Sequence, residues 1–226
     1  MKTPFKQSGK LYLITDRLVS GLNHFEMTRR AIHAGIRIVQ IREKNMAKKD
    51  LFREVVLIRN LTLRYGITLI INDYVDIALT VNADGIHLGQ EDMPIQEARK
   101  ILGKNKIVGI STHSLRQALD AQKEGADYIG YGPIFKTATK NTGKLKGPEA
   151  LVEIKKHIKI PVAAIGGINI LNAPDVLKKG ADALAVASGI LSGDIEKNAK
   201  KFLSVINRSE NPSLAKRGKG RFFNQK

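Results

Sequence analysis

Short apolar segments recur about every 25 residues along the chain, and most of them end in polar residues. Apolar runs of roughly four to eight residues, bounded by polar or turn residues, are typical of buried strands. The segments predict eight strands, at residues 11–14, 38–41, 68–71, 85–88, 107–110, 128–131, 162–165 and 183–186. A strand interior disfavours polar residues, so we expect these polar endings to gather in one shared site.

The stretches between the strands have the apolar spacing of helices, as in residues 52–63 and 115–122. Strict alternation of helices with nearly continuous apolar strands indicates an α/β protein with a parallel sheet. Eight units in 226 residues fit a single (β/α)8 barrel of the TIM type better than an open doubly wound sheet. We predict a barrel domain over residues 1–207, with its active face at the strand ends, and a basic tail over 208–226.

Composition narrows the class of protein. Hydrophobic residues make up 42% of the chain, enough for a large core. The sequence shows neither an apolar run of about eighteen residues nor a basic leader followed by an apolar segment, so we expect a cytoplasmic protein without a membrane span. The lack of cysteine excludes disulfides, thiolate metal sites and cysteine nucleophiles.

The formal charge of +17 predicts anionic partners, which are either small phosphorylated molecules or nucleic acid. Much of the excess lies in lysine pairs on predicted helices, where lysines are usually solvated. The tail adds lysines and arginines among glycines without helical periodicity, a pattern typical of a free segment. We therefore expect phosphorylated substrates and no membrane partner, and we rank weak RNA binding lower. The oligomeric state stays open, a homo-oligomer included.

Two carboxylates follow neighbouring predicted strands. Asp73 comes directly after the third strand, and Asp92 lies a few residues past the fourth. Such a pair suits Mg²⁺, which binds a few carboxylate oxygens together with water and substrate phosphate. The alternative is that each aspartate caps the helix that follows it, so the metal prediction depends on the pair.

Gln40, Arg42 and Lys44 alternate along the second strand and its exit, so their side chains project to the same side of the chain. On a barrel strand that side is the interior or the mouth. Buried cations need anionic partners, and a diphosphate would satisfy both of them. The alternative is an internal salt bridge from Arg42 to Glu43 or a neighbouring carboxylate.

The connection over residues 132–147 is long for a strand-to-helix loop, which is typical of lids and binding segments. Its Thr137, Thr139 and Lys140 suit phosphate oxygens. A soluble surface loop rich in lysine is the alternative.

Glycines follow the last two strands, in Gly166-Gly167 and Ser188-Gly189. Barrels often bind a phosphate at these two exits, through glycine amides and the start of a short helix. Tight turns alone are the alternative explanation of these glycines.

Residues 111–113 leave the fifth strand, and His113 is a candidate general acid or base, with simple packing as the alternative. Ser114 is predicted to cap the next helix. His87, in an apolar strand, is predicted to be a hydrogen-bonded core residue. We place the remaining histidines on helix surfaces: His24, His33 and His157.

Taken in order, these motifs resemble the thiamine phosphate synthase family over roughly residues 10–207. The matching segments are residues 12–16 (YLITD), 40–44 (QIREK), 72–73 (ND), 87–93, 111–113, 132–140 and 166–168. Several motifs in a fixed order are more specific than any one of them. The resemblance implies a barrel that joins hydroxymethylpyrimidine diphosphate to a thiazole phosphate, or its carboxylated form, and releases pyrophosphate with the aid of Mg²⁺.

The resemblance also implies a role for each candidate residue. In the family's reaction a pyrimidine carbocation forms as pyrophosphate departs, so no nucleophilic side chain is needed, and Arg42, Lys44, Ser111 and Lys140 would stabilise the leaving group. It places Gln40, Arg42, Lys44, Asn72, Ser111 and Lys140 at the pyrimidine diphosphate, Asp73 and Asp92 at the metal, and Thr137, Thr139, Gly167, Ala187 and Ser188 at the thiazole phosphate.

The chain departs from the family pattern at Lys136, usually proline, at Ala187, often valine, and in residues 141–147, which lack the usual proline-rich turn. Two other functions compete with the synthase. A thiazole tautomerase of the same fold would use His113 and would not need the diphosphate residues. A non-catalytic barrel that binds RNA would show steep salt dependence and would leave the two aspartates unexplained.

Overall fold

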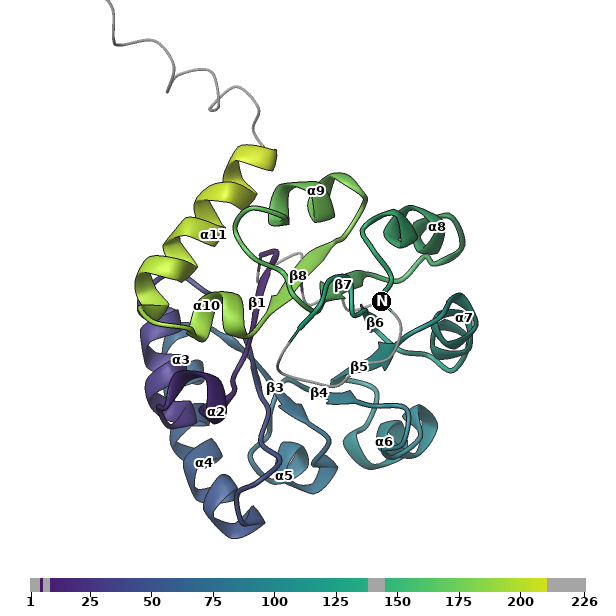
Figure 1. The fold of residues 1–226 in the computed structure, drawn as a ribbon. Coiled ribbons are helices and arrows are strands. Elements are labelled where there is room, and N and C mark those ends of the chain that lie inside the picture. The colour runs from purple at the N-terminus through teal and green to yellow at the C-terminus, as the bar shows by residue number, and fades with distance from the viewer. Residues whose placement is uncertain (1–4, 6–8, 138–144, 211–226) are drawn as a thin grey trace, which may run out of the picture.

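The computed structural model describes residue 5 and residues 9–137 and 145–210. Eight parallel strands close into a barrel in the order β1 to β8, with helices around the outside (Figure 1). The prediction of a (β/α)8 barrel is therefore confirmed. The strands are β1 (Leu11–Ile14), β2 (Ile38–Ile41), β3 (Thr68–Asn72), β4 (Gly85–Leu88), β5 (Ile107–Thr112), β6 (Tyr128–Tyr131), β7 (Val162–Ile165) and β8 (Ala183–Val186).

The helices follow the strands in sequence and cover the outer surface of the barrel. They are α2 (Arg17–Ser20), α3 (His24–His33), α4 (Lys48–Tyr65), α5 (Val75–Thr80), α6 (Ile95–Leu102), α7 (Leu115–Lys123), α8 (Glu149–His157), α9 (Ala173–Lys178), α10 (Ser188–Leu191) and α11 (Ile195–Glu210). Within the described ranges, no helix is both long and apolar enough to cross a membrane.

Three element ends differ from the sequence prediction. Strand β3 continues to Asn72 and β5 to Thr112, so polar residues that we assigned to loops belong to the strands. Helix α11 continues to Glu210, past the predicted start of the tail at residue 208. Its buried residues keep helical spacing up to Ile206, and Glu210 forms an ion pair with Lys10 at 3.2 Å. The rest of the predicted tail, residues 211–226, lies outside the described residues.

The hydrophobic core has two layers. The larger layer lies between the strands and the helices, and a smaller one fills the barrel interior, where Phe5 packs against Tyr12 and Tyr128. A Cβ at Gly109 would lie 2.1 Å from the Tyr128 ring, so the interior has room for this ring only because β5 has glycine there. The ring is fully buried, and its hydroxyl points toward the polar part of the barrel.

An aspartate directly precedes each of β4, β6 and β8, at the end of the barrel opposite the polar strand ends. Each carboxylate accepts a hydrogen bond at 2.8 Å from the first or second backbone N–H of the preceding strand. Each also pairs with a cation of a covering helix. The three sets are Asp84 with Leu69 and Arg59, Asp127 with Val108 and Arg99, and Asp182 with Val162 and Lys155. These contacts join β3 to β4, β5 to β6 and β7 to β8.

Replacing Asp127 with alanine is expected to destabilise the protein by about 1–3 kcal/mol, because the N–H of buried Val108 loses its acceptor. The change in unfolding midpoint in urea measures this effect. Asp120→Ala is the matched control, since its pair with Arg116 is exposed and 3.9 Å long. Equal midpoints for the two variants would contradict the bridging role.

Candidate active site

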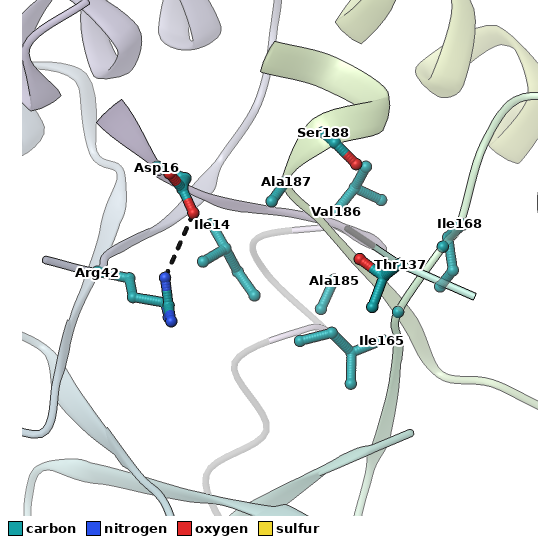
Figure 2. Close-up of a pocket in the computed structure, with 12 residues that line it drawn as sticks. Ile14, Asp16, Arg42, Thr137, Ile165, Ile168, Ala185, Val186, Ala187 and Ser188 are labelled. Carbon is teal, nitrogen blue, oxygen red and sulfur yellow. Dashed lines mark hydrogen bonds and ion pairs between the residues drawn. The ribbon is translucent and has the colours of Figure 1, made fainter. Parts of the chain in front are cut away.

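A pocket opens where the carboxyl ends of the strands meet. The space between its walls measures about 530 Å³, open solvent at its mouth included. Figure 2 shows Arg42 and Asp16 on one side, Thr137 and Ile168 on the other, and the residues that follow β8 between them. Five residues predicted from the sequence line it together: Arg42, Thr137, Gly167, Ala187 and Ser188.

The turn after β7 packs closely against the segment that follows β6. Gly167 has φ 63°, and a Cβ there would lie 2.4 Å from the carbonyl oxygen of Lys136. Gly166, with φ 95°, approaches Pro133 in the same way. These two glycines let residues 133–137 lie against the turn, and Thr137 reaches the pocket as a result. Thr139 and Lys140, predicted to bind phosphate, lie outside the described residues.

Asp73 and Asp92 lie together beside the exit of β2. The Lys44 ammonium donates to Asp73 Oδ2 at 2.5 Å. Burial and the neighbouring Asp92 carboxyl raise the pKa of Asp73, although Lys44 acts in the opposite direction. Asp92 accepts a hydrogen bond at 2.6 Å from the backbone N–H of Gly89. A pair of carboxylates crowded enough to raise a pKa is suited to a divalent cation.

The capping alternative for these aspartates finds no support. Helix α5 has Tyr74 at its N-cap and α6 has Pro94, and neither helix has a side-chain cap. The described residues contain no group of three or more His, Cys, Asp or Glu side chains that could hold a metal. A pair is still sufficient for Mg²⁺, because this ion usually keeps several waters and takes its other ligands from substrate phosphate.

A chain of hydrogen bonds crosses the barrel interior beneath the site. The Gln40 amide donates to the Tyr12 hydroxyl at 2.6 Å, and the Tyr12 and Tyr128 hydroxyls lie 2.8 Å apart. His87 lies 2.9 Å from both the Tyr128 hydroxyl and Ser111 Oγ. Burial raises the pKa of both tyrosines, so each keeps its proton at neutral pH. The chain ties Gln40 and Ser111 together, and it confirms His87 as a hydrogen-bonded core residue.

Three other residues singled out from the sequence make ordinary structural contacts. Asn72 is the buried last residue of β3 and pairs in register with His87 on β4. His113 donates from Nδ1 to the carbonyl oxygen of Gly132 at 2.7 Å, which agrees with the packing alternative. Ser114 accepts from the backbone N–H of Gln117 and caps α7 as predicted.

Arg42 does form an internal ion pair, with Asp16 Oδ2 at 3.3 Å. Asp16 also caps α2 by accepting from the N–H groups of Leu18 and Val19. Glu43, which we considered as the partner of Arg42, contacts His24 and Arg17 instead. Glu43 lies past the end of β2, and its other carboxylate oxygen accepts from the backbone N–H groups of Lys44 and Asn45.

His24 was wrongly assigned to a helix surface. Its side chain is 0% exposed, and it lies between Thr15 and Glu43. The spacing of His24, Met27, Thr28 and Ala31 contained the signal, because positions i, i+3, i+4 and i+7 share one helix face. These four residues and Ile32 are the buried residues of α3. Sequence reasoning also missed Tyr12 and Tyr128 as polar members of the core.

Comparison with known proteins shows the family to which this chain is similar. A family model described as thiamine monophosphate synthase matches residues 11–190. The chain is 47% identical over 199 residues to the thiamine-phosphate synthase of Clostridium novyi, covering 87% of this chain and 98% of the relative. It is 44% identical over 202 residues to the thiamine-phosphate synthase of Clostridium acetobutylicum, covering 88% and 96%. The solved thiamine phosphate pyrophosphorylase of Pyrococcus furiosus is 40% identical with a TM-score of 0.82, covering 88% and 96%.

Proposed function

The chain belongs to the thiamine monophosphate synthase family, and from that membership we propose that it joins 4-amino-2-methyl-5-hydroxymethylpyrimidine diphosphate to 4-methyl-5-(2-hydroxyethyl)thiazole phosphate, or its carboxylated form. It is a transferase. The C–O bond to the diphosphate breaks, and pyrophosphate leaves with the electron pair. The thiazole nitrogen then donates its pair to the pyrimidine methylene carbon, which gives thiamine phosphate; with the carboxylated thiazole, the carboxyl group also leaves as carbon dioxide.

The observation that carries this proposal is the convergence of two cations and two carboxylates at the mouth. Arg42 and Lys44 leave one strand exit, and Lys44 contacts Asp73, whose pKa the neighbouring Asp92 helps to raise. A diphosphate with Mg²⁺ satisfies both kinds of charge. Isomerisation of a thiazole phosphate alone develops no pyrophosphate charge and would leave this arrangement without a use.

Each group has a role in pyrophosphate departure. Arg42 and Lys44 donate to diphosphate oxygens, and Ser111 adds a hydroxyl held from below by His87. Gln40 and Asn72 orient the pyrimidine end from inside the barrel. Asp73 and Asp92 would hold Mg²⁺, which neutralises the charge that develops on the leaving group. Fixed donors aimed at developing charge are usually the largest contribution to catalysis.

The thiazole phosphate is assigned to the pocket that Thr137, Gly167, Ala187 and Ser188 line. Backbone N–H groups and the hydroxyls of Thr137 and Ser188 would supply donors there, and Arg42 lines the same pocket on the side of the diphosphate. Thr139 and Lys140 belong to this proposal from their place in the sequence, Thr139 at the thiazole phosphate and Lys140 at the diphosphate. Ala187 leaves more space than the valine that the family often has.

Gly167→Ala is expected to raise the KM for thiazole phosphate about tenfold, with a smaller effect on the KM for the pyrimidine diphosphate. The added Cβ collides with the Lys136 carbonyl and displaces the segment that carries Thr137. Steady-state kinetics with each substrate varied in turn measures both constants. Gly193→Ala is the control, because Gly193 has φ 83° but an added Cβ meets nothing within 4 Å. Equal KM changes in the two variants would refute the steric argument.

The function is tested by incubating the purified protein with both substrates and measuring thiamine phosphate and pyrophosphate, with Mg²⁺ or with EDTA. Equal amounts of the two products, formed only with the metal, are the expected result. Folded protein that forms neither product would overturn the proposal, and conversion of the thiazole substrate alone would identify a tautomerase.

A further inference from the structure

His24 is fully buried, yet it lies beside the proposed active site. It is the first residue of α3, and its ring bridges the exits of β1 and β2. Nδ1 lies 2.8 Å from Thr15 Oγ1, and Nε2 lies 3.0 Å from Glu43 Oε2. A carboxylate accepts hydrogen bonds and does not donate them, so Nε2 carries a hydrogen and donates it to Glu43.

The two partners of His24 hold the backbone from which Arg42 and Lys44 project. The other oxygen of Glu43, Oε1, accepts from the backbone N–H groups of Lys44 and Asn45, each at 2.7 Å. Thr15 Oγ1 accepts from the backbone N–H of Arg42 at 3.2 Å. Thr15 Oγ1 also donates to the carbonyl oxygen of Gln40 at 3.2 Å, so these two side chains together hold the end of β2 and its exit.

Glu43 is buried, yet its surroundings favour the ionised carboxylate. Burial raises its pKa, but the N–H groups of Asn45 and Lys44 and the His24 ring lower it by more, so that it lies below its ordinary value. Arg17 also approaches, with 3.7 Å between Nη1 and Oε2. An ionised Glu43 holds the exit of β2 with charge-assisted bonds, and these are stronger than neutral ones.

We propose that His24 is a positioning residue for the diphosphate: it fixes Glu43 and Thr15, which in turn fix the directions of Arg42 and Lys44. The inference depends on the proposed function, since it concerns how that site is held. His24 itself touches no substrate, because it is enclosed by protein. The residues assigned to the thiazole phosphate come from the segments after β6, β7 and β8, whereas the side-chain hydrogen bonds of His24 go to the segments after β1 and β2.

His24→Leu removes both hydrogen bonds and keeps much of the volume. We expect it to raise the KM for the pyrimidine diphosphate, and the Kd for pyrophosphate with Mg²⁺, by about tenfold. The KM for thiazole phosphate is expected to change less than about twofold, because the binding of that substrate stays roughly the same. Calorimetric titration with pyrophosphate measures the binding change independently of turnover.

Three further variants separate positioning from stability. His24→Gln retains an N–H donor toward Glu43 and is expected to restore most of the pyrophosphate affinity. Glu43→Gln is expected to weaken pyrophosphate binding in the same direction, and it tests the same path should His24→Leu not fold. Ile32→Ala removes buried volume from the same helix and is expected to lower the unfolding temperature without changing the ratio of the two KM values.

The outcomes distinguish this inference from the proposed function. An active wild-type protein whose His24→Leu and Glu43→Gln variants keep the wild-type pyrophosphate Kd would overturn the inference alone. Equal increases in the KM of both substrates would also overturn it, because that pattern indicates general loosening. A wild-type protein without activity and without affinity for pyrophosphate would overturn the proposed function, and the inference with it.

Discussion

Replacing Asp92 with alanine is expected to lower kcat/KM by about 100- to 1000-fold, the range measured when one preorganised charge-stabilising group is removed from an active site. Asp92 is one of only two carboxylates proposed for Mg²⁺. The other, Asp73, already contacts Lys44 at 2.5 Å and cannot replace the missing oxygens. The backbone N–H of Gly89 also loses its acceptor, so the segment after β4 is no longer fixed in the same way.

The measurement is the rate of pyrophosphate release as a function of Mg²⁺ concentration. We expect the half-saturating concentration to rise as well as the maximal rate to fall. Asp76→Ala is the matched control, because Asp76 is a nearby carboxylate that pairs with Lys48 and is 63% exposed. Wild-type rates and an unchanged Mg²⁺ requirement in Asp92→Ala would exclude Asp92 from the metal site.

Asp73→Asn is expected to abolish most of the activity and yet to make the metal-free protein more stable at neutral pH. Burial and Asp92 raise the pKa of Asp73, so the folded state holds a proton on this carboxyl more tightly than the unfolded state does. The stability from this proton is present below the ordinary pKa of aspartate and is lost as the pH rises through the raised folded-state value. At neutral pH the ionised group opposes folding, and a neutral amide removes that opposition.

Two local features favour the same outcome. Asp73 has φ 62°, a left-handed conformation that asparagine also adopts readily, so the substitution adds no backbone strain. Lys44 loses its partner, but its side chain is 49% exposed and water can solvate the ammonium. Function and stability therefore oppose each other at this position, which is common where like charges are crowded for a cation.

Thermal unfolding in EDTA at a series of pH values measures the effect. The unfolding temperature of Asp73→Asn is expected to exceed that of wild type at pH 7, and the difference is expected to shrink as the pH falls. Asp76→Asn is the control, and its unfolding temperature at pH 7 is expected to change in the opposite direction. Burial raises the pKa of Asp76, but Lys48 and backbone N–H groups lower it by more, so this carboxylate favours folding at neutral pH. A less stable Asp73→Asn protein at pH 7 would refute the argument.

The barrel could be predicted because its strands are almost wholly apolar and its helices separate them at regular intervals. That pattern can be read from the residue types alone, without knowing which residues contact one another. It also predicted which polar residues reach the mouth. Arg42, Thr137, Gly167, Ala187 and Ser188 line one pocket because all of them follow strand ends. The pair of Asp73 and Asp92 follows from the same rule, because the carboxyl ends of neighbouring strands meet.

The ion-pair and hydrogen-bond partners of these side chains could not be predicted in the same way. Lys44 was assigned to a diphosphate and Asp73 to a metal, and the structure shows that the two also contact each other. Arg42 contacts Asp16, while Glu43 contacts His24, and both partners come from the segment after β1 and the start of α3. The tyrosines of the barrel interior were taken as apolar residues because a hydroxyl buried far from its partner in sequence leaves no periodic signal.

The aspartates that precede β4, β6 and β8 have a consequence for engineering. Each carboxylate ties the two strands of one strand–helix–strand unit together, so β3–β4, β5–β6 and β7–β8 are three internally linked units of the barrel. The remaining unit, β1–β2, has Arg37 before its second strand and lacks this link. A circular permutant opened between β4 and α6 leaves all three closures intact, whereas one opened between α6 and β5 separates Arg99 from Asp127. New chain ends are therefore best placed after an even-numbered strand.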